Sequence, residues 1–259
     1  MNSAAKPVHL LDLHVHLKGG LTLDQALDQS RRDGIQYGIA VNCGKGFPVQ
    51  DDAAALAFCI SLKGQPVFAG MQAEGREWTS MFSLQAASQF DYIFTDAMTW
   101  TDDHGRRMRL WIAEEVGTIA DIEEFMDTLV ARSVEIIETE PIDIFVNPTF
   151  LPAVIAADYD RLWTDGRMAR VIDAAVRNGV AIELNDLYHL PSRRFVLMAK
   201  AAGCKFTLGT NNTGPSDLGR SEYGRKMIDE CDLAGDDFFV PGKGDLKAAL
   251  RKPQAFRAV

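Results

Sequence analysis

Two histidines near the N-terminus, His14 and His16, are the residues of this chain best suited to metal chemistry. They end an apolar run, and their two-residue spacing places both imidazoles on one face of a β-strand, because side chains alternate between faces along a strand. Imidazole nitrogens at the C-terminal end of a strand begin the metal site of many barrel hydrolases. The spacing therefore predicts a metal-binding pair that points into a barrel.

The strand that carries these histidines is expected over residues 8–16. Asp12 shares a face with His14 and His16, and we expect that face to point inward. Because a metal-ligating histidine usually donates its second ring nitrogen to a neighbouring group, Asp12 is expected to orient one of the imidazoles. The opposite face is an apolar stripe that we expect to pack against helices, and it consists of Leu11, Leu13, Val15 and Leu17.

The composition limits the class of protein and of partner. The chain has 259 residues, of which 47% are hydrophobic and 24% are charged, as in one large α/β domain. The formal net charge of −9 and the sequence pI near 5.1 argue against nucleic acid or an anionic membrane as the main partner, since both select for basic surfaces. We therefore expect a small anionic or polar molecule as the partner.

The sequence also predicts where the protein is found. No apolar stretch approaches the roughly 20 residues needed to cross a bilayer, and no signal segment opens the chain. The four cysteines are scattered without metal-type spacing, so we expect a cytoplasmic protein. A chain whose export signal had been removed would look the same, so export stays an alternative. Self-association is suggested by three aromatic residues expected at the surface, Trp78, Trp100 and Trp111.

Short apolar strands alternate with amphipathic helices about seven times, which indicates a parallel α/β barrel formed by one domain over residues 1–259. The strands are expected at residues 8–16, 37–42, 67–74, 92–96, 142–147, 181–185 and 205–211. The helices are expected at residues 22–32, 51–63, 121–138, 163–178, 192–202 and 224–231. Thr22 and Gln25 form a capping box that begins the first helix, and Gly34 ends it. The turn signal at residues 102–105 predicts a projecting hairpin between residues 98 and 118.

Each expected strand ends in a polar residue that is in phase with its inward face. In barrels the C-terminal ends of the strands form the active site. In the fifth strand Asn147 is in phase with Asp143 and Phe145, so Ile144 and Val146 are expected to face outward. The polar residues expected around one pocket are His16, Asn42, Glu74, Asp96, Asn147, Glu183, Asn185 and Asn211.

Three parts of the chain resemble the PHP family, the polymerase and histidinol phosphatase type of metal-dependent phosphoesterase. They are Asp12-Leu13-His14-Val15-His16 with residues 34–41, then residues 90–94, and then residues 181–211, which are the most specific. The resemblance covers nearly the whole chain. It implies a single-domain, distorted (β/α)7 TIM-like barrel that commonly holds two or three divalent ions of zinc, manganese or iron, which activate water against a phosphate ester.

The chain departs from the family pattern at several ligand positions. His14, His16 and Glu74 stand where the family keeps ligands, but Asn42 and Cys43 replace an Asp-His pair. Other family ligands are missing at Met98, Asn147, Asn211, Asn212 and Thr213. A carboxamide offers only a weak neutral oxygen, and neighbouring metals need anionic ligands between them to offset their repulsion. We therefore expect one ion at most, or none. The expected ligands are His14, His16, Glu74 and Asp96.

Further residues are expected to act on the substrate. Glu183 and Asp96 are the candidate catalytic residues, because a carboxylate buried at a strand end can have a pKa raised toward neutrality. The alternative for Glu183 is a structural hydrogen bond to Asn185. The residues expected to bind substrate are Asn42, Asn147, Asn185, Asn211, Arg106 and Arg107. The two arginines belong to the predicted hairpin, where they would bind a phosphate or carboxylate group or else pair with acidic residues of the surface.

The leading hypothesis is a PHP-like metal-dependent hydrolase of the phosphoesterase type, with a reduced site. The alternative is a catalytically silent barrel that binds a small anionic or polar ligand. A lower-ranked alternative is an amidohydrolase or deaminase, because His14-Val15-His16-Leu17 before a pair of glycines also resembles that group. Such enzymes need a terminal aspartate, and Asn211 and Asn212 stand in its place.

Overall fold

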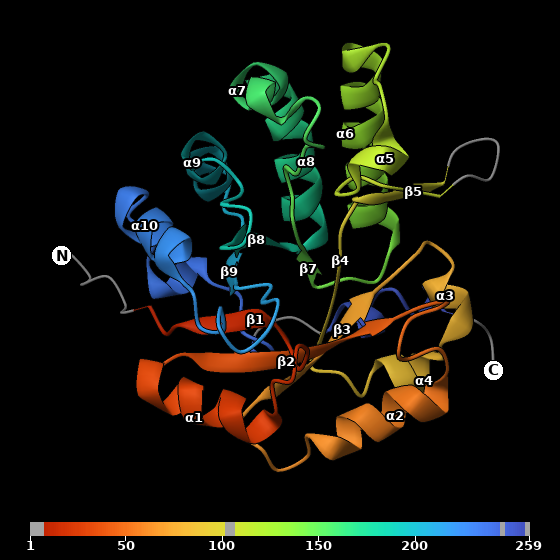
Figure 1. Cartoon of the computed structure of the whole chain (residues 1–259), viewed down its shortest axis with the longest axis vertical. Helices are drawn as coiled ribbons and strands as arrows, with labels where there is room; N and C mark the ends of the chain where they lie inside the picture. Colours follow the sequence, from red (N-terminus) through yellow and green to blue (C-terminus); the bar gives the residue numbers. More distant parts are fainter. Residues whose placement is uncertain (1–7, 102–106, 244–246, 257–259) are drawn as a thin grey trace.

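A closed barrel of seven parallel strands forms the centre of the molecule (Figure 1). The computed structural model describes residues 8–101, 107–243 and 247–256. The barrel strands, in spatial order, are β1 (Leu11–His16), β2 (Gln36–Cys43), β3 (Phe68–Ala73), β4 (Tyr92–Thr95), β7 (Ile144–Phe145), β8 (Ala181–Asn185) and β9 (Phe206–Gly209). Each strand pairs with the next, and Asp12 of β1 pairs with Leu208 of β9 to close the sheet. The predicted TIM-like barrel is confirmed.

Helices surround this barrel (Figure 1). Those of two turns or more are α1 (Leu23–Asp33), α2 (Asp52–Ser61), α6 (Ile122–Thr139), α8 (Asp165–Asn178), α9 (Arg193–Ala201) and α10 (Glu222–Glu230). One-turn helices that the sequence analysis missed are α3 (Trp78–Met81), α4 (Leu84–Ala87), α5 (Ala113–Val116), α7 (Tyr159–Leu162) and α11 (Ala248–Arg251). Among the described residues no helix has the length and apolar character of a membrane span.

The local signals at α1 act as the sequence predicts. The Thr22 hydroxyl accepts a hydrogen bond from the backbone N–H of Gln25, and the Gln25 side chain accepts one from the backbone N–H of Thr22 at 2.9 Å. Gly34 ends the helix with a φ of 66°, a left-handed conformation that glycine adopts without steric cost. This capping fixes the point at which the chain enters β2.

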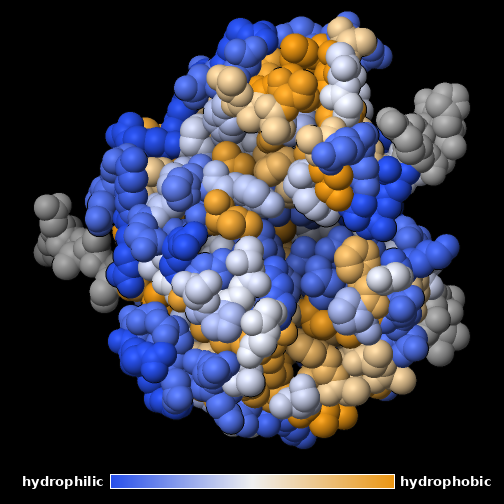
Figure 2. Space-filling model, viewed as in Figure 1, coloured by the Kyte–Doolittle hydropathy of each residue, from blue (hydrophilic) through white to orange (hydrophobic). Residues whose placement is uncertain are grey.

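The predicted hairpin is present between β4 and α5. Its strands are β5 (Thr99–Thr101) and β6 (Arg107–Arg109), which pair antiparallel. Arg106, predicted to bind substrate, lies outside the described residues. Of the three tryptophans expected at the surface, Trp111 is exposed. Trp78 and Trp100 are buried, so the expectation that they support self-association from the surface is wrong. The face in Figure 2 is largely hydrophilic and is hollowed between the part that carries α6 and the part that carries α3.

Apolar side chains fill the part of the barrel interior beneath the strand ends. This cluster consists of Leu11, Leu13, Ala40, Tyr92, Phe94, Ile144, Val146 and Ala181. Tyr92 is fully buried, and its hydroxyl donates a hydrogen bond to the Leu13 carbonyl oxygen at 2.7 Å. Gly38 and Gly70 make room for its ring, since a Cβ at either position would lie within 2.5 Å of the Tyr92 hydroxyl oxygen. The barrel is therefore a packed core and not a channel.

The register of β1 corrects one sequence expectation. Leu11 and Leu13 belong to the interior cluster, although the alternation predicts that they pack outward with Val15. The pairing of β1 with β2 shifts between Asp12 and Val15, as in a β-bulge. The irregularity interrupts the strict alternation, so that leucines and histidines both reach the interior from one strand.

The phase of the fifth barrel strand is also the reverse of the prediction. Ile144 and Val146 face the interior, whereas Phe145 packs in the outer core against the helices. Asn147 nevertheless reaches the polar end of the barrel because its backbone is left-handed, with a φ of 49°. Asparagine adopts this conformation more readily than most residues. The chain therefore turns at Asn147, and a period of two does not extend through it.

Burial of the carboxyl group of Asp186 makes the fold sensitive to pH. Asp186 follows β8 and accepts hydrogen bonds from the backbone N–H groups of Tyr223, at 2.7 Å, and Gly224 in α10. Burial is the largest cause that raises its pKa from 3.8 to about 7. The folded protein therefore keeps the neutral form up to a higher pH than the unfolded chain does.

Replacing Gly70 with alanine is expected to destabilise the protein by about 1–3 kcal/mol, the usual range for overpacking a core. The added Cβ would lie 2.4 Å from the Tyr92 hydroxyl oxygen. Urea denaturation measures the effect. Gly166→Ala in α8 is the matched control, because its Cβ would meet no atom within 4 Å. An unchanged midpoint for Gly70→Ala would contradict the packing of Tyr92 described above.

Asp186→Asn is expected to remove a pH-dependent loss of stability. Between about pH 4 and pH 7 the folded state of the unmodified protein holds a proton on Asp186 that the unfolded state has lost, so the free energy of unfolding falls as the pH rises. The free energy of unfolding of the variant, relative to that of the unmodified protein, should increase across this window. Urea titrations at several pH values test this, with Asp173→Asn on the exposed face of α8 as control. A constant difference would show that Asp186 does not titrate there.

Candidate active site at the barrel mouth

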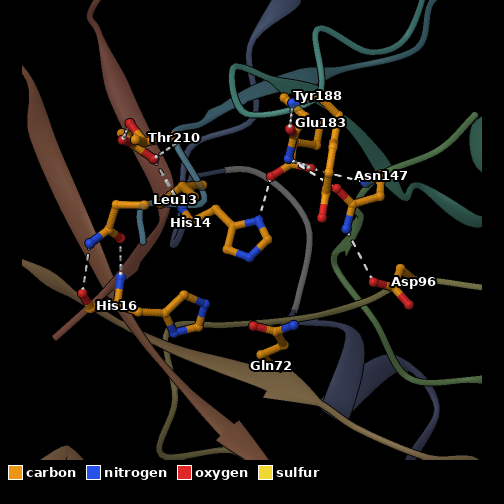
Figure 3. A network of polar contacts seen from close by, with 12 residues as sticks. Leu13, His14, His16, Gln72, Asp96, Asn147, Glu183, Tyr188 and Thr210 are labelled. Carbon is orange, nitrogen blue, oxygen red and sulfur yellow. Dashed lines mark hydrogen bonds and ion pairs between the residues drawn. The ribbon is translucent and has the colours of Figure 1, made fainter. Parts of the chain in front are cut away.

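A buried hydrogen bond between His14 and Glu183 forms the centre of the barrel mouth (Figure 3). The Nδ1 atom of His14 lies 2.6 Å from Oε1 of Glu183, and the two residues are 1% and 0% exposed. This contact requires the proton on Nδ1, so in the neutral imidazole the lone pair is on Nε2. Among the described residues, His14 Nε2 has no hydrogen-bond partner although it is buried. The site therefore presents a nitrogen lone pair that can accept a hydrogen bond or bind a metal ion.

Glu183 is held by several groups at once. Its Oε2 atom accepts hydrogen bonds from the backbone N–H of Asn147 at 2.9 Å and from the side-chain amide of Asn185 at 3.0 Å. Gly209 of β9 leaves space for the carboxylate, since a Cβ there would lie 2.0 Å from Oε1. Both oxygens of Glu183 are thus engaged within the protein. This arrangement fits a residue that orients His14 better than one that exchanges protons with a substrate.

His16 presents its ring beside that of His14, with the ring centroids 5.2 Å apart. Its Nδ1 atom donates a hydrogen bond to the Ala40 carbonyl oxygen at 3.1 Å, which leaves the Nε2 lone pair free of that contact. Burial lowers the pKa of His16 to about 3, so the ring is neutral at physiological pH. Asn212 fixes its backbone, donating to the His16 carbonyl oxygen and accepting from the His16 N–H. Both imidazoles therefore carry the proton on Nδ1, as metal-ligating histidines often do.

Glu74 lies at the same mouth but is engaged by amides. Its Oε1 atom accepts hydrogen bonds from Asn42 at 2.7 Å and from Gln72 at 3.1 Å. Burial and then the charge of Asp96 raise the pKa of Glu74 to about 7. The Oε1 atom of Gln72 is itself buried and has no partner among the described residues. Gln72 was in phase with the inward face of the predicted third strand, and sequence reasoning did not assign it a role.

Asp96 is likewise surrounded by donors. It accepts hydrogen bonds from the backbone N–H of Met98 at 2.9 Å and from the side-chain amide of Asn147 at 3.1 Å. The side-chain oxygen of Asn147 accepts in turn from Asn185 at 3.0 Å. Burial raises the pKa of Asp96. These contacts join Asp96 to Glu183 through two asparagines, so the amides form the framework of the mouth (Figure 3).

Asn211 and Asp12 form hydrogen bonds with the backbone of His14. The N–H of Asn211 donates to the His14 carbonyl oxygen at 2.9 Å, and its φ of 48° is left-handed like that of Asn147. Asp12 accepts from the backbone N–H of His14 and from the N–H and hydroxyl of Thr210. Asp12 therefore ties β1 to the end of β9. It does not orient an imidazole, which corrects the expectation; Glu183 does so for His14.

Tyr188 is a further residue of the mouth that the sequence analysis did not identify. Its backbone N–H donates to the side-chain oxygen of Asn185 at 2.8 Å. In Figure 3 its ring extends from the loop after β8 toward the space beside His14 and Asn147. Burial, Asp96 and Glu183 raise its pKa, which agrees with this position. The available signal was the loop itself, which follows a strand rich in polar residues.

The predicted metal ligands do not converge as a set of four. In the part of the chain that the structure describes, no three side chains of the His, Cys, Asp and Glu types form a group that could hold a metal ion. Glu74 and Asp96 accept hydrogen bonds from amide donors, whereas His14 Nε2 is buried without a hydrogen-bond partner among the described residues. The side chains that these residues leave available at the mouth are thus the two imidazoles. They do not fit a centre of several metals, which needs bridging carboxylates.

Comparisons with known proteins give a likeness of fold. No family model matches the sequence, and no curated protein does. A solved structure of histidinol phosphate phosphatase from Lactococcus lactis subsp. lactis, in complex with zinc, L-histidinol and phosphate, matches with a TM-score of 0.58 at 12% identity, covering 88% of this chain and 98% of that one. The chain therefore shares the barrel fold of that structure.

Two other solved structures are more distant. A chain of an archaeal ribonuclease P complex with mature tRNA matches with a TM-score of 0.39 at 13% identity, covering 86% of this chain and 91% of that one. A citrate lyase from Burkholderia xenovorans matches with a TM-score of 0.40 at 12% identity, covering 83% and 78%. Neither bears on the function of this protein.

Glu183→Gln is expected to destabilise the protein by about 1–3 kcal/mol, because an amide nitrogen would face either the His14 proton or the donors on Asn147 and Asn185. Urea denaturation measures the loss. ¹⁵N NMR of the imidazole reports the tautomer of His14, which should have its proton on Nδ1 in the unmodified protein.

The matched control for this change is Glu138→Gln. Glu138 pairs with Arg177 at the surface, with its side chain 43% exposed, and exposed pairs contribute little stability. Equal stability of the Glu183 and Glu138 variants would contradict the positioning role of Glu183.

Proposed function

We propose that the protein is a PHP-like metal-dependent hydrolase with a reduced site, in which His14 and His16 hold a single divalent cation. The substrate class that best suits this barrel is a phosphate ester. Glu183 is a positioning residue in this proposal, and Glu74 and Asp96 lie at the mouth without contributing a full set of ligands.

The observation that carries the proposal is the free Nε2 atom of His14. A buried nitrogen without a hydrogen bond costs free energy unless a ligand or ion engages it. A carboxylate on the other ring nitrogen raises the basicity of an imidazole and fixes its orientation, and this is the usual environment of a metal-binding histidine. The neutral ring of His16 supports the same role, because a metal ligand must be unprotonated.

The residues around this pair suit hydrolysis. A divalent cation supplies Lewis-acid polarisation of a phosphoryl oxygen and makes water easier to deprotonate. Asn147 and Asn185 hold Glu183 in place and thereby fix the direction of the His14 ring. The Tyr188 phenol group extends into the mouth, where it can donate a hydrogen bond to an oxygen of a substrate. The similarity in fold to a phosphatase that was solved with zinc and phosphate supports this choice of chemistry.

A second candidate is a catalytically silent barrel that binds a small polar or anionic molecule. It is favoured by the amide groups of Asn42, Gln72 and Asn147, which donate hydrogen bonds to the carboxylate oxygens of Glu74 and Asp96. The amidohydrolase alternative has less support, because Asn212 stands where those enzymes have an aspartate and is engaged by the backbone of His16.

Metal content separates the two candidates. Protein purified without chelator is expected to contain about one equivalent of zinc, manganese or iron by elemental analysis, and His14→Gln and His16→Gln should each reduce it below roughly one-tenth of an equivalent. Hydrolysis of p-nitrophenyl phosphate should fall with the metal content. His9→Gln is the control, since His9 contacts Gln36 on the exposed surface.

The outcomes distinguish the candidates clearly. Less than about one-tenth of an equivalent in the unmodified protein, with no metal taken up on addition of zinc, manganese or iron, would overturn the hydrolase proposal. Bound metal without hydrolysis of any phosphate ester would favour the silent barrel.

A further inference from the structure

A cavity of about 580 Å³ lies beside the barrel mouth, and several basic residues line it. They come from four separate segments, namely Lys45 in the loop after β2, Arg76 after β3, Arg107 in β6 and Arg132 in α6. Two carboxylates, Glu74 and Glu77, also line the cavity. Four cations against two carboxylates give it a positive balance in a chain whose formal net charge is −9. Figure 2 shows the molecule hollowed on the side of α6 and α3.

Aromatic rings position two of these arginines. The Arg107 guanidinium lies over the Phe47 ring at 5.6 Å from its centroid, and the Arg132 guanidinium lies over Trp100 at 5.0 Å. Stacking engages the flat face of a guanidinium and leaves the N–H groups at its edge available. Those edges can donate two parallel hydrogen bonds to a phosphate or a carboxylate. The rings therefore hold both arginines in place without using their donors.

The basic residues differ in whether their charge is already paired. Arg76 binds Glu140 at 2.6 Å and donates to the Thr95 hydroxyl at 2.9 Å. For Lys45, Arg107 and Arg132 the described part of the chain offers no carboxylate within 4.0 Å. Glu74 and Glu77 in the lining offset only part of this positive charge, so the cations still repel one another and a bound anion relieves that repulsion.

We propose that this cavity binds an oxyanion, the phosphate or carboxylate group of the ligand, through Lys45, Arg107 and Arg132. Glu74 connects it to the mouth, because Glu74 lines the cavity and also accepts the hydrogen bond from Gln72. The inference rests on the proposed function and adds the residues that would bind the anionic group of the substrate. The sequence analysis predicted that Arg107 binds substrate, and it assigned no role to Lys45 or Arg132.

Isothermal titration of the full chain with inorganic phosphate at low ionic strength tests the proposal. Arg107→Gln, Arg132→Gln and Lys45→Gln should each raise the Kd roughly tenfold or more, the effect of losing a hydrogen bond to a charged group. Arg109→Gln is the matched control in the same hairpin, because Arg109 pairs with Glu115, and it should leave the Kd unchanged. Tryptophan fluorescence provides a second readout, since Trp100 lies under Arg132.

The source of the oxyanion is tested with succinate in parallel. Binding of phosphate alone assigns a phosphate group and binding of succinate alone assigns a carboxylate. Either result supports the proposal when the three variants weaken it. Phosphate binding that the three substitutions leave unchanged would overturn it, as would an absence of binding by both anions. Urea midpoints equal to that of the unmodified protein confirm that each variant is folded.

His14→Gln separates this inference from the proposed function. Phosphate bound in the cavity should keep its Kd in that variant. Phosphate lost on His14→Gln but retained in the arginine variants would mean that the anion binds at the histidines, which overturns this inference and leaves the hydrolase proposal standing. A protein without metal whose phosphate binding still depends on Arg107 and Arg132 would support the cavity while the hydrolase proposal fails.

Discussion

The short contact between His14 and Glu183 is the interaction on which the mouth of the barrel depends. It joins β1 to β8 across the interior, and a buried charge there is tolerated only because every oxygen of the carboxylate has a donor. The contact also selects the tautomer of His14. Gly209 makes the arrangement sterically possible from the next strand. Packing, charge and the availability of one nitrogen lone pair are thus set by a single pair of side chains.

The amide groups give this mouth a different character from a centre of several metals. Asn42, Asn147 and Gln72 each donate to a carboxylate, Glu74 or Asp96, that the sequence analysis expected to bind a cation. A donor N–H satisfies such an oxygen locally and leaves less negative charge to attract ions. What remains is a pair of imidazoles, and beside them a basic cavity. The same fold can therefore shift from ion-centred chemistry toward recognition of an organic anion.

The alternation of polar and apolar residues predicted the seven strands and the inward direction of His14, His16 and Glu183, and the turn signal predicted the hairpin. The alternation failed where the backbone leaves the regular strand. The irregularity between Asp12 and Val15 and the left-handed turn at Asn147 each change the phase, and neither has a signal in a pattern of period two. The partners of individual side chains were also beyond the sequence, because Glu183 and His14 are 169 positions apart and only the closed sheet brings them together.

Closure of the sheet has a consequence for how the protein is made. Asp12 accepts a hydrogen bond from Thr210, which is 198 positions away. This contact lies at the seam between β1 and β9, the first and last strands of the barrel. Contacts of such long sequence separation form slowly because a large loop must close first. A ribosome must therefore release residues beyond 210 before the seam can form. Until then a nascent chain exposes the edge of β1 and the edge of β8, and chaperones would have most to protect in this interval.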